Sequence, residues 1–336
     1  MQPLMITAAC GLTRPPGGEP DSVADVVKAV AMAAKAGAAI AQIRAPSRHD
    51  PVTGRPKTDL KRWLDMIAGI RDACDIVIHA GTAAMQIEDR VAMFRAARPE
   101  IASFLLGHHG IVTRGHEHAS LRTRADGVKL LQAHARTGVR PDFEAFHAGN
   151  LRNLEFILGQ VEVPRPLTLT YFFGWDGGEW SPPTVEELLH RVAMTPANVH
   201  YSITVAGPQQ TIMHALAIAR GGHVRGGPGD YPFCNEGVHW RDCAQFVERA
   251  RRLADEFGRE VATPAQARKF LARRDSVLDG DASVYLPCAV RACEQAGVEY
   301  YTHERGSDFR RFALYRNALP HDKACFREQT RAAWEQ

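Results

Sequence analysis

The sequence predicts a (β/α)8 barrel, a fold in which eight parallel strands alternate with eight helices. Short apolar runs alternate with longer helical runs eight times along the 336-residue chain. This alternation covers roughly 255 residues, the usual size of one such barrel. The apolar runs are compact, as expected for strands buried on both faces. The competing layout, an open doubly wound sheet, requires a glycine fingerprint after the first strand, which Gly11-Leu12-Thr13 does not supply.

The first half of the predicted barrel begins with an apolar strand at 3–10 (PLMITAAC). Asp21 or Ser22 is suited to cap the next helix, and Gly37 closes it. Residues 45–58 contain too many prolines and glycines for regular structure. The expected elements up to residue 106 are strands at 3–10, 38–44, 75–80 and 101–106, helices at 23–36 and 60–72, and a helix that follows the turn at 81–84 and ends near residue 95.

The second half repeats the pattern, and Gly138 closes its first helix. Thr263-Pro264-Ala265 then begins a short extra helix, with Thr as the cap and Pro in the first turn. We therefore assign residues 1–274 to one barrel domain. The expected strands are 139–146, 167–173, 200–205 and 223–225, and the expected helices are 121–137, 150–159, 185–194, 210–220 and 240–257.

Residues 275–336 form an extension beyond the barrel. Two parts of it, 284–296 and 323–334, are weakly helical, and the segment between them is aromatic and basic. We expect this extension to pack on the barrel or on a neighbouring subunit. Its His303, Cys288, Cys293 and Cys325 show no spacing typical of metal ligands.

The charge balance of the chain is nearly even. Lys and Arg total 41 and Asp and Glu total 38, so the formal net charge is +3. This balance gives no indication of a nucleic-acid or membrane-surface partner, and no apolar stretch approaches membrane-spanning length. Arginine is abundant and lysine scarce, which suits anionic small molecules, although a GC-rich genome produces the same bias. Seven scattered cysteines without a C-x-x-C pair, and a start without a basic signal region, predict reduced thiols, no signal peptide and a cytoplasmic location.

The stretch 221–230 (GGHVRGGPGD) is expected to be the eighth strand and a glycine-rich turn. Its five glycines allow the backbone to bend sharply and to lie close to a bound group. Arg225 and Asp230 fall at the exit of this strand, where a barrel enzyme carries its chemistry. A tight turn closed by an Arg–Asp ion pair is equally consistent with the pattern.

The ends of the other predicted strands supply further candidates. Arg44 and Arg225 are suited to bind a carboxylate through paired hydrogen bonds, or to pair with acids of the barrel. Glu144 lies in a strand beside Phe143, so it is either a general base or the partner of an arginine. Asp230 is either a base or a cap. The full set of candidates is Gln42, Arg44, His79, Thr82, His108, His109, Glu144, Arg225 and Asp230.

Three of these residues, His79, His108 and His109, also suit a zinc site. A lone inward histidine is more often a hydrogen-bonded core residue. Two adjacent histidines cannot easily direct both rings at one ion. We therefore predict no metal site built from these residues.

Several stretches occur in an order that is specific to one protein family. They are 3–9 (PLMITAA), 36–38 (AGA), 50–56 (DPVTGRP), 205–207 (VAG), 221–225 (GGHVR) and 262–268 (ATPAQAR). On these motifs, residues 1–274 resemble the β-keto acid cleavage enzymes, which are named after the 3-keto-5-aminohexanoate cleavage protein. The extension has no matching counterpart.

The resemblance implies a barrel enzyme that condenses a β-keto acid with acetyl-CoA and releases acetoacetate and a new acyl-CoA. It also implies a homo-oligomer, a tetramer or larger. Family sites hold a divalent metal, usually zinc, on a His-x-His pair and a Glu. Here those positions are Gln42, Arg44 and Gly229, so the resemblance predicts that the zinc site is lost.

Other family positions differ or remain. A family serine corresponds to Gly81 beside Thr82, a family asparagine corresponds to Leu105, and residues 47–49 are an insertion. In contrast, Glu144, Arg225 and Asp230 match the family's acid, arginine and aspartate. In the family, the arginine and the aspartate together deprotonate the keto acid.

The combined prediction is an enzyme that cleaves a carbon–carbon bond of a carboxylate-bearing keto compound. Arg225 and Asp230 would form the base unit, and Arg44 would place its fixed charge where the metal stood. Gln42, His79, Thr82 and His108 are predicted to bind substrate. Two alternatives stay open: a hydrolase or lyase that does not use acetyl-CoA, and a barrel that binds a small molecule without catalysis.

Overall fold

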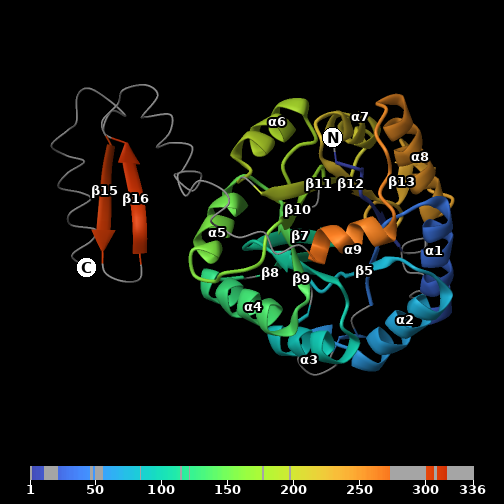
Figure 1. The fold of residues 1–336 in the computed structure, drawn as a ribbon, viewed down its shortest axis with the longest axis horizontal. Helices are drawn as coiled ribbons and strands as arrows, with labels where there is room; N and C mark the ends of the chain where they lie inside the picture. The colour runs from blue at the N-terminus through green and yellow to red at the C-terminus, as the bar shows by residue number, and fades with distance from the viewer. Residues whose placement is uncertain are drawn as a thin grey trace. The chain divides into compact units, whose positions relative to one another are not determined.

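The computed structural model describes residues 2–10, 22–45, 48–49, 56–83, 85–113, 116–120, 122–175, 178–196, 198–272, 300–305 and 309–315. The chain divides into two compact units, Met1–Ser276 and Val277–Gln336. In the first unit, parallel strands close into a barrel that the helices surround (Figure 1). The predicted (β/α)8 barrel is therefore confirmed.

The eight strands of the barrel pair in the order β1-β12-β11-β10-β9-β6-β5-β2, so the last strand closes the ring against the first. Ile6 of β1 lies beside Val224 of β12, and Thr7 lies beside Ile40 of β2. The strands are β1 (Ile6–Ala9), β2 (Ile40–Ile43), β5 (Val77–Ala80), β6 (Ile101–Leu105), β9 (Arg140–Ala145), β10 (Leu167–Phe173), β11 (Val199–Val205) and β12 (His223–Gly226). Each one lies at its predicted place.

The helices also begin and end close to the predicted residues, because their caps are encoded locally. Ser22 and Asp25 form a capping box at the start of the first helix, and Thr123 and Asp126 form another. The helices are α1 (Val23–Ala36), α2 (Leu60–Ala73), α3 (Ile87–Ala97), α4 (Arg124–Thr137), α5 (Gly149–Leu158), α6 (Val185–Met194), α7 (Gln210–Ala219), α8 (Cys243–Glu256) and α9 (Pro264–Ala272). Among the described residues, no helix is long and apolar enough to cross a membrane.

Strand side chains divide between two cores. Those that point outward, such as Ile6, Phe104 and Val224, pack with the apolar faces of the helices in one large buried cluster. A smaller cluster lies at the N-terminal ends of the strands, where Met5 and Ile40 pack with Phe270 of α9. Figure 1 shows α9 crossing this end of the barrel. The C-terminal ends of the strands lie on the opposite side and carry the candidate site.

Four short hairpins were not predicted from the sequence, and the first of them corrects the expectation that residues 45–58 lack regular structure. They pair β3 (Arg48–His49) with β4 (Pro56–Lys57), β7 (His109–Thr113) with β8 (His116–Ser120), β13 (Phe233–Asn235) with β14 (Val238–His239), and β15 (Tyr300–Arg305) with β16 (Phe309–Tyr315). The last hairpin belongs to the second unit and contains the aromatic segment of the extension. The helices predicted at 284–296 and 323–334 lie outside the described residues, and what the extension packs against remains a prediction.

Buried arginines fasten the ends of several strands. Arg191 donates hydrogen bonds to the carbonyls of Ala145, Phe146 and Phe172 at the ends of β9 and β10. Arg90 similarly reaches the carbonyl of Ser103 in β6. A guanidinium carries five donors in a fixed plane, so one side chain can satisfy several buried carbonyls. These contacts hold the strand ends around the candidate site.

Candidate active site

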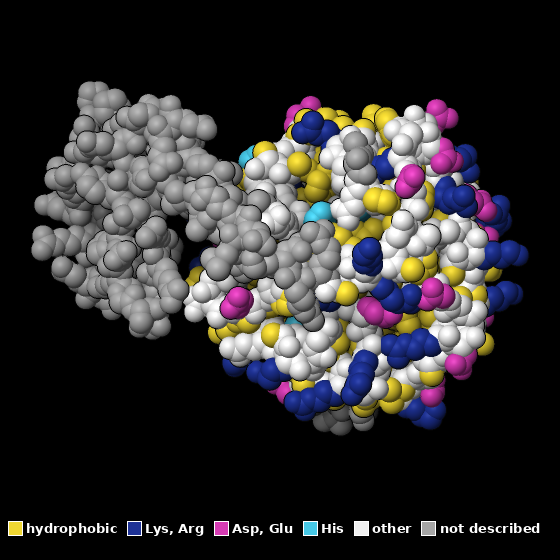
Figure 2. Space-filling view, viewed as in Figure 1, with side chains coloured by type: hydrophobic (Ala, Val, Ile, Leu, Met, Phe, Trp, Pro, Cys, Tyr) yellow, Lys and Arg dark blue, Asp and Glu magenta, His cyan; other side chains and the backbone are white. Residues whose placement is uncertain are grey.

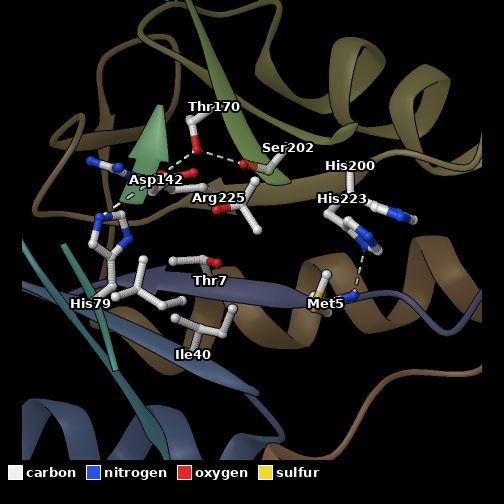
Figure 3. Close-up of a pocket in the computed structure, with 12 residues that line it drawn as sticks. Met5, Thr7, Ile40, His79, Asp142, Thr170, His200, Ser202, His223 and Arg225 are labelled. Carbon is white, nitrogen blue, oxygen red and sulfur yellow. Dashed lines mark hydrogen bonds and ion pairs between the residues drawn. The ribbon is translucent and has the colours of Figure 1, made fainter. Parts of the chain in front are cut away.

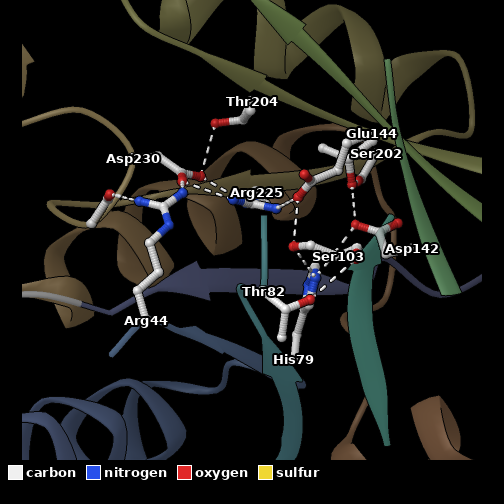
Figure 4. A network of polar contacts seen from close by, with 12 residues as sticks. Arg44, His79, Thr82, Ser103, Asp142, Glu144, Ser202, Thr204, Arg225 and Asp230 are labelled. Atoms are coloured by element: carbon white, nitrogen blue, oxygen red, sulfur yellow. Dashed lines mark hydrogen bonds and ion pairs between the residues drawn. The ribbon is translucent and has the colours of Figure 1, made fainter. Parts of the chain in front are cut away.

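Arg225 lies at the centre of the candidate site, and its side chain is 1% exposed. Its Nε and Nη2 donate to the two carboxylate oxygens of Asp230 at 2.8 and 2.9 Å. Its Nη1 lies 3.3 Å from Glu144 Oε1 across the barrel. The guanidinium also lies 5.0 Å from the ring centre of Phe172. Figure 4 shows one arginine bridging the two acids, and pairing with arginine was one of the alternatives left open for each of them.

Arg44 reaches the same carboxylate from the end of β2. Its Nη2 donates to Asp230 Oδ1 at 2.6 Å, and its Nη1 donates to the carbonyl of Gly229. Its side chain is 46% exposed, whereas that of Asp230 is 6% exposed. Thr204 Oγ1 donates to Asp230 Oδ2 at 3.0 Å, so three side chains hold this acid. Arg44 and Arg225 therefore converge on one carboxylate, while the roles predicted for them in binding and catalysis remain predictions.

The turn that carries Asp230 is pressed against the end of β1. The backbone N–H of Gly229 donates to the carbonyl of Ala9 at 3.0 Å. A Cβ added at Gly229 would lie 2.9 Å from that carbonyl oxygen, and Gly227 has a φ of 123°. Only glycine meets both requirements without strain. The glycine-rich segment therefore serves to bring Asp230 back onto Arg225.

Arg225 and Asp230 each stabilise the charged form of the other. Burial favours the neutral form of Asp230, but Arg225 and Arg44 outweigh it and hold the pKa of the carboxyl well below its ordinary value. Burial also lowers the pKa of Arg225, but Asp230 and Glu144 raise it by more. Both groups are therefore charged near neutral pH, and Asp230 is a weak base while both guanidiniums contact it.

A second layer of polar side chains lies beneath Glu144. Ser103 Oγ donates to Glu144 Oε1 at 2.8 Å and lies 3.3 Å from His79 Nε2. Asp142, two residues before Glu144 on the same face of β9, accepts from Thr170 Oγ1 at 2.7 Å. Burial and the nearby Glu144 raise the pKa of Asp142 to about 7. Burial and Arg225 hold the pKa of His79 well below its ordinary value, so its ring is neutral.

This second layer borders an interior cavity, shown in Figure 3. Hydroxyl, carboxyl and imidazole groups line much of it, together with apolar residues near the starts of the strands. The lining residues are Met5, Thr7, Ile40, His79, Ile101, Asp142, Thr168, Thr170, His200, Ser202, His223 and Arg225.

The other predicted substrate-binding residues lie in different surroundings. Gln42 is buried, and both polar atoms of its amide lack a hydrogen-bond partner among the described residues. Thr82 is buried and donates to the carbonyl of Ser103 at 3.3 Å. His108 is exposed, and its Nδ1 accepts from the backbone N–H of Arg122, so the structure does not bring it into the network around Arg225. The side chain of His109 lies outside the described part of the chain.

The residues that the resemblance places at the family's zinc positions do not suit zinc. Arg44 is a cation that already donates to Asp230, Gly229 has no side chain, and Gln42 offers only an amide. A different group does bring potential ligands together, because one atom each of His79, Asp142 and Glu144 lies within 4.8 Å of the others. The loss of all metal binding therefore remains a prediction.

Sequence reasoning missed Ser103, Asp142, Thr170 and Thr204. A signal was present for Asp142, because a strand directs residues two apart to the same side and Glu144 was already placed inward. Ser103, Thr170 and Thr204 likewise occupy inward positions of their strands. Hydroxyl residues are common in strands, so the sequence alone gave no reason to select them.

Comparison with known proteins gives the family of the chain. Residues 3–272 match the sequence profile of the beta-keto acid cleavage enzymes. The chain is 28% identical over 279 residues to the 3-keto-5-aminohexanoate cleavage enzyme of Acetoanaerobium sticklandii, which covers 81% of this chain and 98% of that enzyme. It is 26% identical over 279 residues to the 3,5-dioxohexanoate:acetyl-CoA acetone transferase of Paraburkholderia graminis, covering 75% and 87% of the two chains.

A solved structure of ObcA with oxaloacetate shares the fold, with a TM-score of 0.60 and 15% identity. The similarity covers 75% of this chain and 66% of the ObcA chain. The barrel fold and the profile match agree with one another. The chain belongs to the β-keto acid cleavage enzyme family and is a carbon–carbon bond-cleaving enzyme.

Proposed function

We propose that this enzyme transfers the acyl part of a β-keto acid to the thiol of coenzyme A, with acetyl-CoA as co-substrate and acetoacetate as second product. The observation that carries this proposal is the sharing of the Asp230 carboxylate between Arg225 and Arg44. It places one acid and two fixed positive charges at a single point of the barrel. A β-keto acid has the complementary groups: a carboxylate, a ketone oxygen and an acidic carbon between them.

Arg44 has two tasks in this proposal. Without substrate, it contacts Asp230 and keeps that carboxylate a weak base. The anionic substrate competes for Arg44, whose half-exposed side chain is free to turn toward it. Loss of one guanidinium raises the basicity of Asp230 at the moment when the substrate arrives. The displaced Arg44 then faces the ketone oxygen, where negative charge develops.

The reaction balances with groups that the chain and its substrates supply. Asp230 takes the proton from the carbon between the ketone and the carboxylate, and Arg44 stabilises the enolate oxygen. The enolate carbon attacks the thioester carbon of acetyl-CoA and displaces the coenzyme A thiolate. The thiolate attacks the original ketone carbon, the bond to the former enolate carbon breaks, and acyl-CoA forms. The acetoacetate carbanion takes the proton back from Asp230.

Glu144 orients Arg225 in this scheme. Glu144 accepts hydrogen bonds from Arg225 Nη1 and from Ser103. Arg225 is therefore held between Glu144 and Asp230 and stays in place when the substrate binds. Gln42 offers an amide whose buried atoms have no partner among the described residues, and a substrate oxygen would satisfy it. Since the zinc positions of the family do not suit an ion here, no step of the scheme uses one at Arg44.

The test is to incubate the enzyme with a panel of β-keto acids and acetyl-CoA, and to measure acyl-CoA and acetoacetate by mass spectrometry. We expect both products to form together, and to be lost in Asp230→Asn. Free acid without a new thioester would show a hydrolase instead. Thermal stabilisation by a keto acid without any product would show a binding protein. If Arg44 supplies the positive charge, activity should not depend on zinc. The assay is therefore repeated after chelator treatment, with and without added zinc.

The quaternary structure is a separate proposal. Family resemblance predicts a homo-oligomer, a tetramer or larger. Light scattering on the full chain measures its mass directly.

A further inference from the structure

A second polar cluster lies deeper in the barrel than Arg44 and Asp230. His79 comes from β5, and Asp142 and Glu144 come from β9, with β6 between these two strands. The three side chains are buried, and one potential ligand atom of each lies within 4.8 Å of the others. Figure 4 shows them converging around Ser103 of β6. We call His79, Asp142 and Glu144 the inner cluster.

No direct hydrogen bond joins the three members of the inner cluster; Ser103 Oγ lies between two of them, 3.3 Å from His79 Nε2 and 2.8 Å from Glu144 Oε1. His79 Nε2 lies 3.8 Å from Asp142 Oδ2, which is beyond hydrogen-bonding range. When two ligand atoms each lie about 2.0–2.2 Å from one ion, the distance between the two ligand atoms is close to the separation of His79 Nε2 and Asp142 Oδ2. Both hydrogen bonds that the described residues make to Glu144 end on Oε1. The second oxygen of this carboxylate therefore remains available as a ligand.

The negative charge of Asp142 also favours binding of a cation. Glu144 and Asp230 contact Arg225, but no guanidinium or ammonium of the described residues forms an ion pair with Asp142. Its hydrogen bond from Thr170 is neutral. A buried carboxylate without a cation is costly unless it is protonated or coordinates a metal.

The cavity beside the inner cluster offers room for the remaining ligands. His79 and Asp142 both line it, as do the hydroxyl groups of Thr7, Thr170 and Ser202 (Figure 3). Water in this cavity would complete the coordination of an ion held by three side chains.

We propose that His79, Asp142 and Glu144 bind one divalent transition-metal ion inside the barrel. This site differs from the zinc positions of the family, which correspond to Gln42, Arg44 and Gly229. One imidazole and two carboxylates suit Zn²⁺, Mn²⁺, Fe²⁺ or Co²⁺. Mg²⁺ is a poorer match because it prefers oxygen ligands in near-ideal octahedral geometry. The ion neutralises Asp142 and fixes Glu144 beneath Arg225, and its binding does not depend on the proposed reaction.

The experiment measures binding directly. The full chain is stripped with a chelator and dialysed against micromolar Zn²⁺ or Mn²⁺, and bound metal is counted by mass spectrometry. We expect one ion per chain. Co²⁺ is added separately, since its visible absorption reports a bound, non-aqueous ligand set. The substitutions His79→Gln, Asp142→Asn and Glu144→Gln should each weaken binding at least about tenfold, as is usual for loss of a group that supports a metal.

Two control variants separate the inner cluster from other sites. His223→Gln changes a buried histidine of the same cavity that is not in the cluster, and Arg44→Gln changes the zinc position of the family. Both should still bind one ion. Wild-type protein that binds no stoichiometric Zn²⁺, Mn²⁺ or Co²⁺ would overturn the proposal, even if every variant failed to fold. Binding that is lost in Arg44→Gln but kept in Asp142→Asn would place the ion elsewhere and would also overturn it.

Discussion

Arg44 and Asp230 are 186 positions apart in the sequence, yet Arg44 Nη2 lies 2.6 Å from Asp230 Oδ1. The same oxygen accepts from Arg225 Nη2 at 2.9 Å. One buried carboxylate is thus shared by a rigid arginine from β12 and a half-exposed arginine from β2. The buried member fixes the position of the acid, and the exposed member is able to leave it.

The first prediction concerns Arg44→Gln. This change should lower kcat/KM about 10²–10³-fold, because a charge that stabilises the enolate oxygen is removed. The free energy of unfolding should change by less than about 1 kcal/mol, because the Arg44 side chain is 46% exposed and water screens its ion pair. Steady-state kinetics and urea unfolding of the same preparation measure both quantities.

Arg44→Lys and Arg152→Gln complete this test. Lysine keeps the charge but cannot donate two parallel hydrogen bonds, so its activity should fall between those of wild type and Arg44→Gln. Arg152 forms an exposed ion pair with Glu155 on α5, so Arg152→Gln should leave activity unchanged. Full activity in Arg44→Gln would contradict the role that we give to Arg44.

The second prediction concerns Gly81 at the end of β5. A Cβ added there would lie 2.8 Å from Arg44 Cγ and 3.0 Å from the carbonyl oxygen of Ile43, and closer still to the amide of Gln42. Gly81→Ala should therefore displace Arg44 from Asp230 and reduce activity at least tenfold. It should also destabilise the fold by about 1–3 kcal/mol, as overpacking usually does. Gly159→Ala, at the exposed C-cap of α5 where the backbone angles are helical, is the control for the loss of a glycine.

The third prediction concerns Ser103→Ala. Removal of its hydroxyl leaves Glu144 with Arg225 as its remaining hydrogen-bond donor among the described residues. Since a hydrogen bond to a charged group contributes about 1.5–3 kcal/mol, kcat should fall about 10–100-fold, with a smaller effect on KM. Ser202→Ala is the matched control, because Ser202 bonds Thr170 and not Glu144. Equal losses in both variants would indicate a general packing effect.

The fourth prediction is a pH dependence of stability. Burial and Arg90 lower the pKa of His134 to about 3, although the hydrogen bond between its ring and the carbonyl of Val139 acts in the opposite direction. In the unfolded chain the same group has a pKa near 6.5. As the pH falls below about 6.5, the His134 imidazole binds a proton in the unfolded state but not in the folded state. Stability should therefore decrease toward pH 4, by at most about 1.4 kcal/mol per pH unit for this group.

Urea unfolding at pH 7, 6 and 5 measures this slope. His134→Gln removes the titrating group, so its stability should change less steeply with pH than that of wild type. His190→Gln, which alters an exposed histidine of α6, should keep the wild-type slope. Parallel curves for wild type and His134→Gln would refute the assignment.

The barrel was predictable from sequence because its signals are local. Apolar runs, the caps at Ser22 and Thr123 and the closing glycines each act within a few residues, and together they placed every barrel strand and helix of the described chain. The short hairpins were missed because they lack apolar runs of sufficient length. The β15–β16 pair contains the aromatic and basic segment of the extension, for which no strand was predicted.

The candidate site was predictable in part, and for a physical reason. Strand ends in a barrel converge, so Arg44, Glu144, Arg225 and Asp230 were expected to lie together, and they do. The inner layer depends on which inward residues approach one another across the ring. That relation involves Ser103, Thr170 and Thr204 on three different strands, and no periodic pattern encodes it.

The buried arginines that fasten the strand ends have a consequence for the outer surface. Five arginine side chains are buried among the described residues, against three acidic side chains, those of Asp142, Glu144 and Asp230. These groups take more positive than negative charge away from the surface of the described residues, and Figure 2 shows basic and acidic side chains interspersed on one face. A polyanion such as a coenzyme meets little long-range attraction on its approach. The association rate of the coenzyme should therefore vary only weakly with ionic strength, and its recognition begins where it first contacts the candidate site.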